Sequence, residues 1–273
     1  MKGFIGELTG TFILVLFGCG SVAVSILFGA YTGILQIGIS WGIGVMLAIY
    51  LTRHLSCAHL NPAVSIGMVI AGRMSLSKLP VYFCAQFAGA ILAGLSVYLL
   101  FSSTITAWEA ANQIVRGTPA SVATAKMFGE YYAVEGSMAV VSMPLAISAE
   151  AFGTFLLMFF IFALTEGCNV GRPDMNLAPV FIGMSVTAII CLIAPLTQAG
   201  LNPARDFGPR MVAWLFGWGD AAFPDGSGGF FWVYIAGPVI GSSLSALLFV
   251  TLYEPLMKKK QCCNLNSKKN DTK

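Results

Sequence analysis

Long runs of apolar residues alternate with short polar segments along almost the whole chain. A helix needs about 20 apolar residues to cross the hydrocarbon core of a membrane. Six runs reach that length, near Phe4–Phe28, Thr32–Thr52, Leu79–Phe101, Met143–Leu164, Leu177–Gln198 and Phe230–Tyr253. An even number of spans leaves both termini on the same side. The pattern therefore predicts an all-α polytopic membrane protein with six transmembrane helices.

The second half of the chain repeats the first. Glu7-Leu-Thr-Gly-Thr-Phe opens the first run and Glu150-Ala-Phe-Gly-Thr-Phe opens the fourth; an Asn-Pro-Ala triplet follows them by 54 and 52 residues, at Asn61 and Asn202. Because each half has three spans, an odd number, the halves must cross the membrane in opposite directions. We expect inverted repeats over about residues 4–102 and 143–253, joined by an outer loop, 103–142. Such a repeat places the solute site near the membrane midplane.

The segment after the first triplet is too short to cross the membrane. Val64–Gly72 would form ~13 Å of helix at 1.5 Å per residue, against a core about 30 Å thick. A short segment can enter the membrane only where its irregular backbone is buried in protein or faces water. We therefore expect two re-entrant half-helices, one after each triplet, which enter from opposite sides and meet at the centre.

The Asn-Pro-Ala triplets suit the ends of such half-helices. Asn is a preferred N-cap and Pro a preferred first helical residue. The cap uses the amide oxygen, which leaves the NH₂ group free to donate into a pore. Two helix N-termini and these donors would hold a hydroxyl or water oxygen and repel cations. One triplet is usually a simple cap, but two in an inverted repeat predict a pore centre made of Asn61, Pro62, Ala63, Asn202, Pro203 and Ala204.

Composition and charge strengthen the membrane assignment. The chain is 57% hydrophobic and 10% charged, whereas soluble domains have roughly 45–50% and about 25%. With the N-terminus inside, eleven Lys and Arg residues lie on the cytoplasmic side and four outside. This bias predicts cytoplasmic termini. We expect one channel domain, residues 1–256, in a plasma or inner membrane with lipid around it, followed by a lysine-rich cytoplasmic tail, 257–273. Nothing in this pattern predicts a nucleic-acid partner.

Several longer motifs resemble the aquaporin and aquaglyceroporin superfamily, and its glycerol-facilitator branch in particular. They are Ser40-Trp-Gly-Ile-Gly-Val-Met-Leu-Ala-Ile-Tyr-Leu-Thr, Ala58-His-Leu-Asn-Pro-Ala-Val, Ile114-Val-Arg-Gly-Thr, Asn202-Pro-Ala-Arg-Asp-Phe-Gly-Pro-Arg and the Gly-Trp-Gly at 217–219. The resemblance extends from Phe4 to Tyr253. It implies a homotetramer with one pore per subunit.

The resemblance also implies which residues form the selectivity filter. They are Trp41, Ile190, Ala199 and Arg205. Trp41 and Arg205 match the glycerol-conducting pattern. Glycerol facilitators usually have Gly at the position of Ile190 and Phe at that of Ala199, so the filter exchanges an aromatic wall for an aliphatic one. Strictly water-selective channels place His at the position of Ile190.

Four further residues are expected to support the pore. The resemblance implies that Glu7 and Glu150 accept backbone N–H groups of the re-entrant loops; the alternative is a proton relay. His59 is expected to face the pore or pack beside it. Asp206 either lines the outer vestibule or complements the dipole of the helix that it begins.

These features together predict a passive channel for small uncharged solutes, with glycerol foremost, together with water and with urea or similar polyols, and with ions and protons excluded. A water-preferring aquaporin is the first alternative. A secondary transporter also uses inverted repeats and broken helices but needs a coupling acid, and a closed structural membrane protein is a third reading. No phosphate loop, catalytic triad or metal-ligand spacing stands out, so we expect no enzyme activity, no cofactor and no metal site.

Overall fold

The structure is a computed structural model that describes residues 1–132, 139–223 and 229–258 of the 273-residue chain. Its regular elements in these residues are helices and short 3-10 or π-helical turns, the latter labelled η. In chain order they are α1 (Lys2–Phe28), α2 (Ile34–Ser56), α3 (Pro62–Ile70), η1 (Leu76–Lys78), α4 (Leu79–Ala111), η2 (Pro119–Ser121), α5 (Val122–Ala125), α6 (Met143–Thr165), α7 (Ala178–Thr197), α8 (Pro203–Ala213), η3 (Trp214–Trp218), η4 (Gly219–Ala222), α9 (Gly229–Phe231), η5 (Trp232–Ala236), α10 (Gly237–Leu248) and η6 (Phe249–Tyr253).

Six helical segments of the described chain are long and apolar enough to cross a membrane. They are α1, α2, α4, α6, α7 and the composite segment Gly229–Lys258 that contains α9, η5, α10 and η6. The predicted all-α polytopic fold is confirmed. The predicted span limits hold to within five residues, except that α4 continues beyond Phe101 to Ala111. The loop predicted to lie outside therefore begins after Ala111 and not at residue 103, because the polar residues that follow Phe101 end the apolar run without ending the helix.

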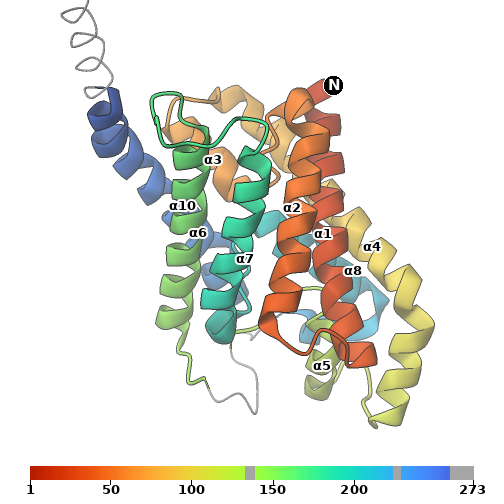
Figure 1. Cartoon of the computed structure of the whole chain (residues 1–273). Coiled ribbons are helices and arrows are strands. Elements are labelled where there is room, and N and C mark those ends of the chain that lie inside the picture. The colour runs from red at the N-terminus through yellow and green to blue at the C-terminus, as the bar shows by residue number, and fades with distance from the viewer. Residues whose placement is uncertain (133–138, 224–228, 259–273) are drawn as a thin grey trace, which may run out of the picture.

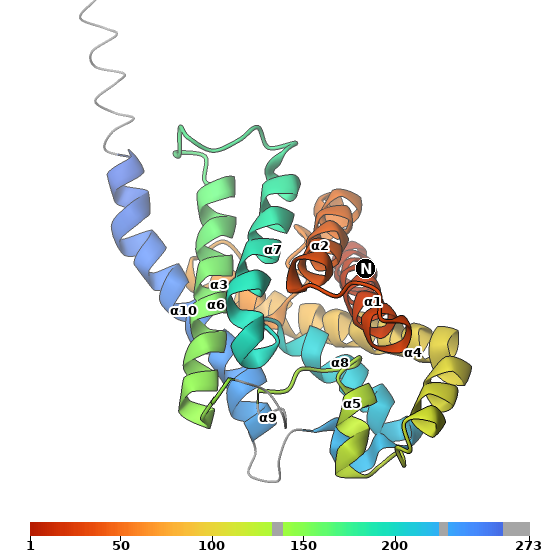
Figure 2. The ribbon, with the colours of Figure 1, turned by 60° about the horizontal axis from the view of Figure 1, so that its bottom comes forward.

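One short helix completes each half of the bundle, α3 in the first and α8 in the second. α3 lies toward the end where the N-terminus and the last described helix also lie, and α8 lies toward the opposite end (Figure 1). Each begins with the Pro of an Asn-Pro-Ala triplet, so α3 covers Pro62–Ile70 and not the predicted Val64–Gly72. In the turned view, α1, α2 and α4 form one side of the molecule, and α6, α7 and α10 form the other (Figure 2). The expected inverted repeat with two half-helices is confirmed.

The halves meet where α2 crosses α7, at Gly42 and Gly183. A Cβ atom on Gly42 would lie 2.5 Å from the carbonyl oxygen of Gly183, and one on Gly183 would lie 2.4 Å from that of Gly42. Small residues allow membrane helices to approach this closely. The crossing is therefore made of backbone on both sides. It also fixes the separation of Trp41 on α2 and Ile190 on α7, two of the expected filter residues.

Candidate functional site

The Asn side chains of the two triplets cap α3 and α8 in the same way. Asn61 Oδ1 accepts the backbone N–H groups of Ala63, at 2.8 Å, and Val64, at 3.4 Å. Asn202 Oδ1 accepts those of Ala204, at 3.1 Å, and Arg205, at 3.2 Å. Pro62 and Pro203 occupy the first helical positions. The local capping geometry is as the sequence predicts.

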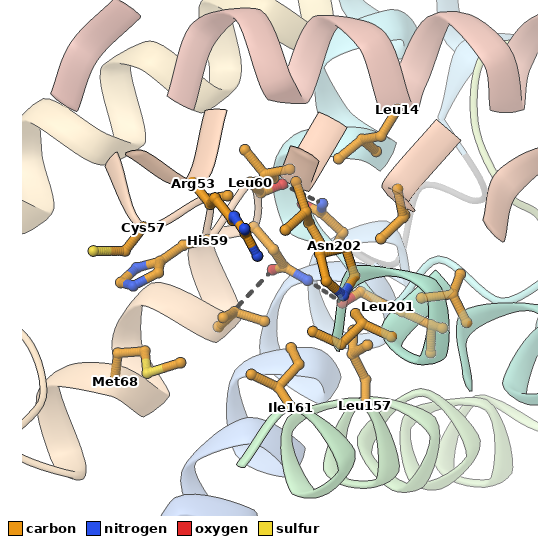
Figure 3. Close-up of a pocket in the computed structure, with 18 of the residues that line it drawn as sticks. Leu14, Arg53, Cys57, His59, Leu60, Met68, Leu157, Ile161, Leu201 and Asn202 are labelled. Carbon is orange, nitrogen blue, oxygen red and sulfur yellow. Dashed lines mark hydrogen bonds between the residues drawn. The ribbon is translucent and has the colours of Figure 1, made fainter. Parts of the chain in front are cut away.

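The NH₂ groups of the same two residues connect the halves of the protein. Asn61 Nδ2 donates to the carbonyl oxygen of Leu201 at 2.9 Å, and Asn202 Nδ2 donates to that of Leu60 at 2.8 Å (Figure 3). Each NH₂ group, expected to be free to donate into a pore, therefore makes one hydrogen bond within the protein. An amide NH₂ carries two hydrogens, so each Asn keeps one N–H with which it can bind a solute.

The loops before the half-helices have matching backbone conformations. Ala58 and Leu60 have φ values of 52° and 55°, and their counterparts Ala199 and Leu201 have values of 65° and 56°. This left-handed region costs a residue with a side chain roughly 1–2 kcal/mol. Such conformations persist only where the surroundings hold them. The two loops must therefore be held by other contacts.

Glu7 and Glu150 provide those contacts. Glu7 accepts the N–H groups of His59, at 2.9 Å, and Leu60, at 2.6 Å. Glu150 accepts those of Gly200, at 2.8 Å, and Leu201, at 2.7 Å. Both side chains are fully buried. Each carboxylate is thus directed at a re-entrant loop, which is the geometry expected for a brace.

Two cavities lead to the expected filter from opposite ends of the bundle. The inner cavity, of about 620 Å³, is lined by His59, both Asn residues of the triplets, Ala199 and Arg205 among others (Figure 3). The second cavity, of about 250 Å³, lies near the loop that contains Lys126 and Glu130, and we call it the outer cavity after the predicted orientation. Trp41 and Ile190 line both cavities. They therefore mark the constriction between the two.

Arg205 lies at this constriction. Its guanidinium carbon is 4.0 Å from the centre of the Trp41 ring, and its Nη2 forms an ion pair with the carboxylate of Glu130. The two charged side chains are only 5% and 7% exposed. Ile190 and Ala199 are 5% and 2% exposed. The structure thus brings the four expected filter residues to one place, and it adds Glu130, which the sequence analysis missed.

Asp206 does not line a vestibule, because its side chain is fully buried. It accepts Arg210 Nε at 2.8 Å and the backbone N–H of Glu130 at 2.8 Å. Arg210 in turn donates to the carbonyl oxygen of Glu130. Asp206 therefore does more than complement the dipole of α8. With Arg210, it attaches the outer loop to α8.

A model of the family described as major intrinsic protein matches residues 1–249. The chain belongs to this family. A glycerol uptake facilitator of Pseudomonas aeruginosa is 42% identical over 243 residues, which cover 89% of this chain and 85% of that protein. A propanediol uptake facilitator of Citrobacter freundii is 40% identical over 261 residues, which cover 95% and 93%. The X-ray structure of the aquaglyceroporin from Plasmodium falciparum matches with a TM-score of 0.80 and 27% identity, over 94% of this chain and 98% of that one.

This major intrinsic protein is a membrane channel and not an enzyme, and the resemblance seen in the sequence is confirmed. Within the described residues, no group of three or more His, Cys, Asp or Glu side chains could hold a metal ion.

Proposed function

We propose that this protein is a passive glycerol channel that also passes water and other small neutral solutes and excludes ions. The observation that carries the proposal is the amphipathic constriction between the two cavities. Glycerol has a hydroxylated edge and a hydrocarbon edge. Arg205 can donate to the hydroxylated edge, while Trp41 and Ile190 offer apolar walls to the hydrocarbon edge. The cationic Arg205 and the N-terminal ends of α3 and α8 oppose the entry of cations.

We further infer that the filter tolerates less hydroxylated diols, including propanediol. Ala199 leaves the filter with one aromatic wall, and Ile190 adds an aliphatic surface beside it. Losing an aromatic contact changes a binding free energy by on the order of 1 kcal/mol, which is a several-fold effect and too small to exclude glycerol. The similarity to a propanediol uptake facilitator agrees with this interpretation.

The assembly and orientation complete the proposal. We infer a homotetramer with one pore per subunit in a plasma or inner membrane, with both termini and the lysine-rich tail, 257–273, in the cytoplasm. Residues 259–273 of that tail lie outside the described residues. The apolar side chains exposed on the outer faces of the span helices, such as Leu47, Leu99 and Leu247, are available to lipid and to neighbouring subunits.

Light scattering from proteoliposomes under separate gradients of glycerol, propanediol, urea and water tests the function. We expect non-saturating flux of both polyols. The matched variant carries Ile190→Gly with Ala199→Phe and should favour glycerol over propanediol several-fold more than the parent does. A parent that passes water but neither polyol would return the protein to the water-preferring alternative, and uphill uptake driven by an ion gradient would indicate a transporter.

A further inference from the structure

The outer cavity is lined by both polar and apolar residues. Its apolar residues include Ile26, Ile34 and Ile37, and its polar residues are Ser25, Lys126, Glu130 and Gln198. A polyol that enters the channel must pass through this cavity before it reaches Trp41 and Ile190, which line its inner end. The cavity is thus the place where the polyol exchanges water for protein contacts.

Arg205 lines the inner cavity at the constriction, and it cannot alone satisfy a hydroxyl group that arrives from the outer cavity. A hydroxyl both donates and accepts hydrogen bonds, whereas a guanidinium group only donates. Gln198 Oε1 already accepts the backbone N–H of Tyr131 at 2.8 Å. The carboxylate of Glu130 can accept about four hydrogen bonds, and Arg205 engages its Oε1 atom. Glu130 therefore retains acceptor capacity next to the donors of Arg205.

Hydrogen bonds hold the backbone of Glu130 in place and so position its carboxylate. The N–H of Glu130 donates to Asp206 Oδ1 at 2.8 Å, and its carbonyl oxygen accepts from Arg210. The next residue, Tyr131, donates its hydroxyl hydrogen to the carbonyl oxygen of Ala221 at 2.6 Å. These bonds fix the loop on both sides of Glu130. A binding group fixed in this way loses little freedom when a solute arrives.

We propose that Glu130 is a solute-binding residue of the channel, whose carboxylate accepts a hydroxyl hydrogen from the entering polyol while Arg205 donates to a hydroxyl oxygen of the same molecule. This proposal rests on the glycerol-channel function above and extends it to a residue of the outer loop. Charge-assisted hydrogen bonds are about twice as strong as neutral ones. The ionised carboxylate therefore lowers the barrier to polyol entry, and neutralising it should reduce polyol flux.

The proposal makes flux depend on external pH. Burial raises the pKa of Glu130 to about 7, although the charge of Arg205 opposes the shift. The ionised form, which binds solute best, is thus present above neutral pH and is lost as the external pH falls. Other titratable or charged groups also surround Glu130: Arg205, Asp206 and Arg210 of α8, Lys126 and Tyr131 of its own loop, Cys19 of α1 and Tyr234 of η5. A variant at position 130 separates its contribution from theirs.

The test measures glycerol uptake by cells that express the full chain, over about two pH units on either side of neutrality. In the parent, uptake should fall at least several-fold as the external pH drops through about 7. In Glu130→Gln, uptake should stay at the low level of the acidified parent at every pH. Glu109→Gln is the matched control, because Glu109 is also a buried outer acid, paired with Arg116 at 2.8 Å, and is not among the described residues that line either cavity. Its uptake should titrate as the parent's does.

The outcomes distinguish the role of Glu130 from the glycerol-channel function. A parent that takes up glycerol equally at all these pH values overturns the role of Glu130, and so does a Glu130→Gln variant that keeps the parent profile. A parent that takes up no glycerol at any pH instead overturns the glycerol-channel function. If Glu130→Gln fails to fold, as shown by lost water permeability, a flat parent profile still overturns the proposal, and Glu130→Asp becomes the test variant: it keeps a carboxylate, so its uptake should fall with external pH as the parent's does, and a profile independent of pH would overturn the role of Glu130.

Discussion

Trp41 can lie beside Arg205 because residue 18 of α1 has no side chain. A Cβ atom on Gly18 would lie 2.2 Å from three atoms of the Trp41 ring. Trp41 itself is 4% exposed and fills the space between α1 and the guanidinium group of Arg205. The position of this filter wall is thus set by a residue that touches no solute. Because the region is closely packed, the Trp41 ring has no free space on the side of α1 into which it could move.

Replacing Gly18 by Ala should therefore move the Trp41 ring toward Arg205 and narrow the constriction. We expect glycerol flux to fall by about tenfold or more, because a misplacement of about 1 Å at a functional site can cost on the order of a hundredfold. Gly20→Ala is the matched control on the same helix, since a Cβ atom there would meet nothing within 4 Å. Flux in proteoliposomes is the measurement. Equal flux through the two variants would contradict this account of the filter wall.

At the scale of whole elements, the two re-entrant loops are the costly parts of the fold. Each places residues with side chains in the left-handed region, at Ala58 and Leu60 in one loop and Ala199 and Leu201 in the other. The carboxylates of Glu7 and Glu150 compensate by accepting the N–H groups that these conformations turn away from regular helix bonds. The half-helices thus depend on one acid each from α1 and α6.

Glu150→Gln should unfold at lower temperature and conduct less. Glu150 accepts three donors, from Thr197, Gly200 and Leu201. Gln has one acceptor oxygen, so its NH₂ group would face at least one N–H donor. A buried donor left without a partner costs about 1–3 kcal/mol. We expect a lower folded yield and a lower melting temperature in detergent.

Glu254→Gln is the control for this prediction, because Glu254 is a partly exposed acid whose side chain is 20% exposed and pairs with Lys258 at 2.5 Å. It should melt like the parent, since exposed ion pairs contribute about 0–1 kcal/mol. If Glu150→Gln folded and melted like the parent, and lost only a response to proton gradients, the proton-relay alternative would replace the brace.

At the scale of the whole molecule, the repeat and the half-helices could be predicted from the sequence, but Glu130 could not. Span length and the paired triplets at Asn61 and Asn202 are local patterns, and each has a direct structural meaning. The contact of Glu130 with Arg205 joins residues 75 positions apart through an outer loop without periodicity. The chain has only 12 acidic residues, so an acid in an outer loop was the one available signal. It did not specify a partner.

Local sequence patterns also could not predict the hydrogen bonds between the halves. A triplet predicts that Asn61 caps its own helix, because that bond forms within three residues. Its second bond, to the carbonyl oxygen of Leu201, exists only because the loop of the other half arrives at the same place. Asn202 and Leu60 form the reciprocal bond. The two halves are thus connected at the midplane by the same residues that would face the solute.

Asn61→Asp and Asn202→Asp should separate the capping role from this connection. Asp caps a helix about as well as Asn, but its carboxylate has no hydrogen to donate and would face the carbonyl oxygen of Leu201 or Leu60. Each variant should lose about 1–3 kcal/mol of stability, conduct less glycerol and admit cations, because a negative charge replaces a donor at the pore centre. The stability loss of the double variant should differ from the sum of the two single losses by about 0.5–3 kcal/mol, since the four residues form one network.

Melting curves, glycerol flux and cation leakage from the same proteoliposomes are the measurements, and Asn112→Asp, at the exposed end of α4, is the control. Variants that stay cation-tight and lose stability only additively would show that the two halves are held together elsewhere.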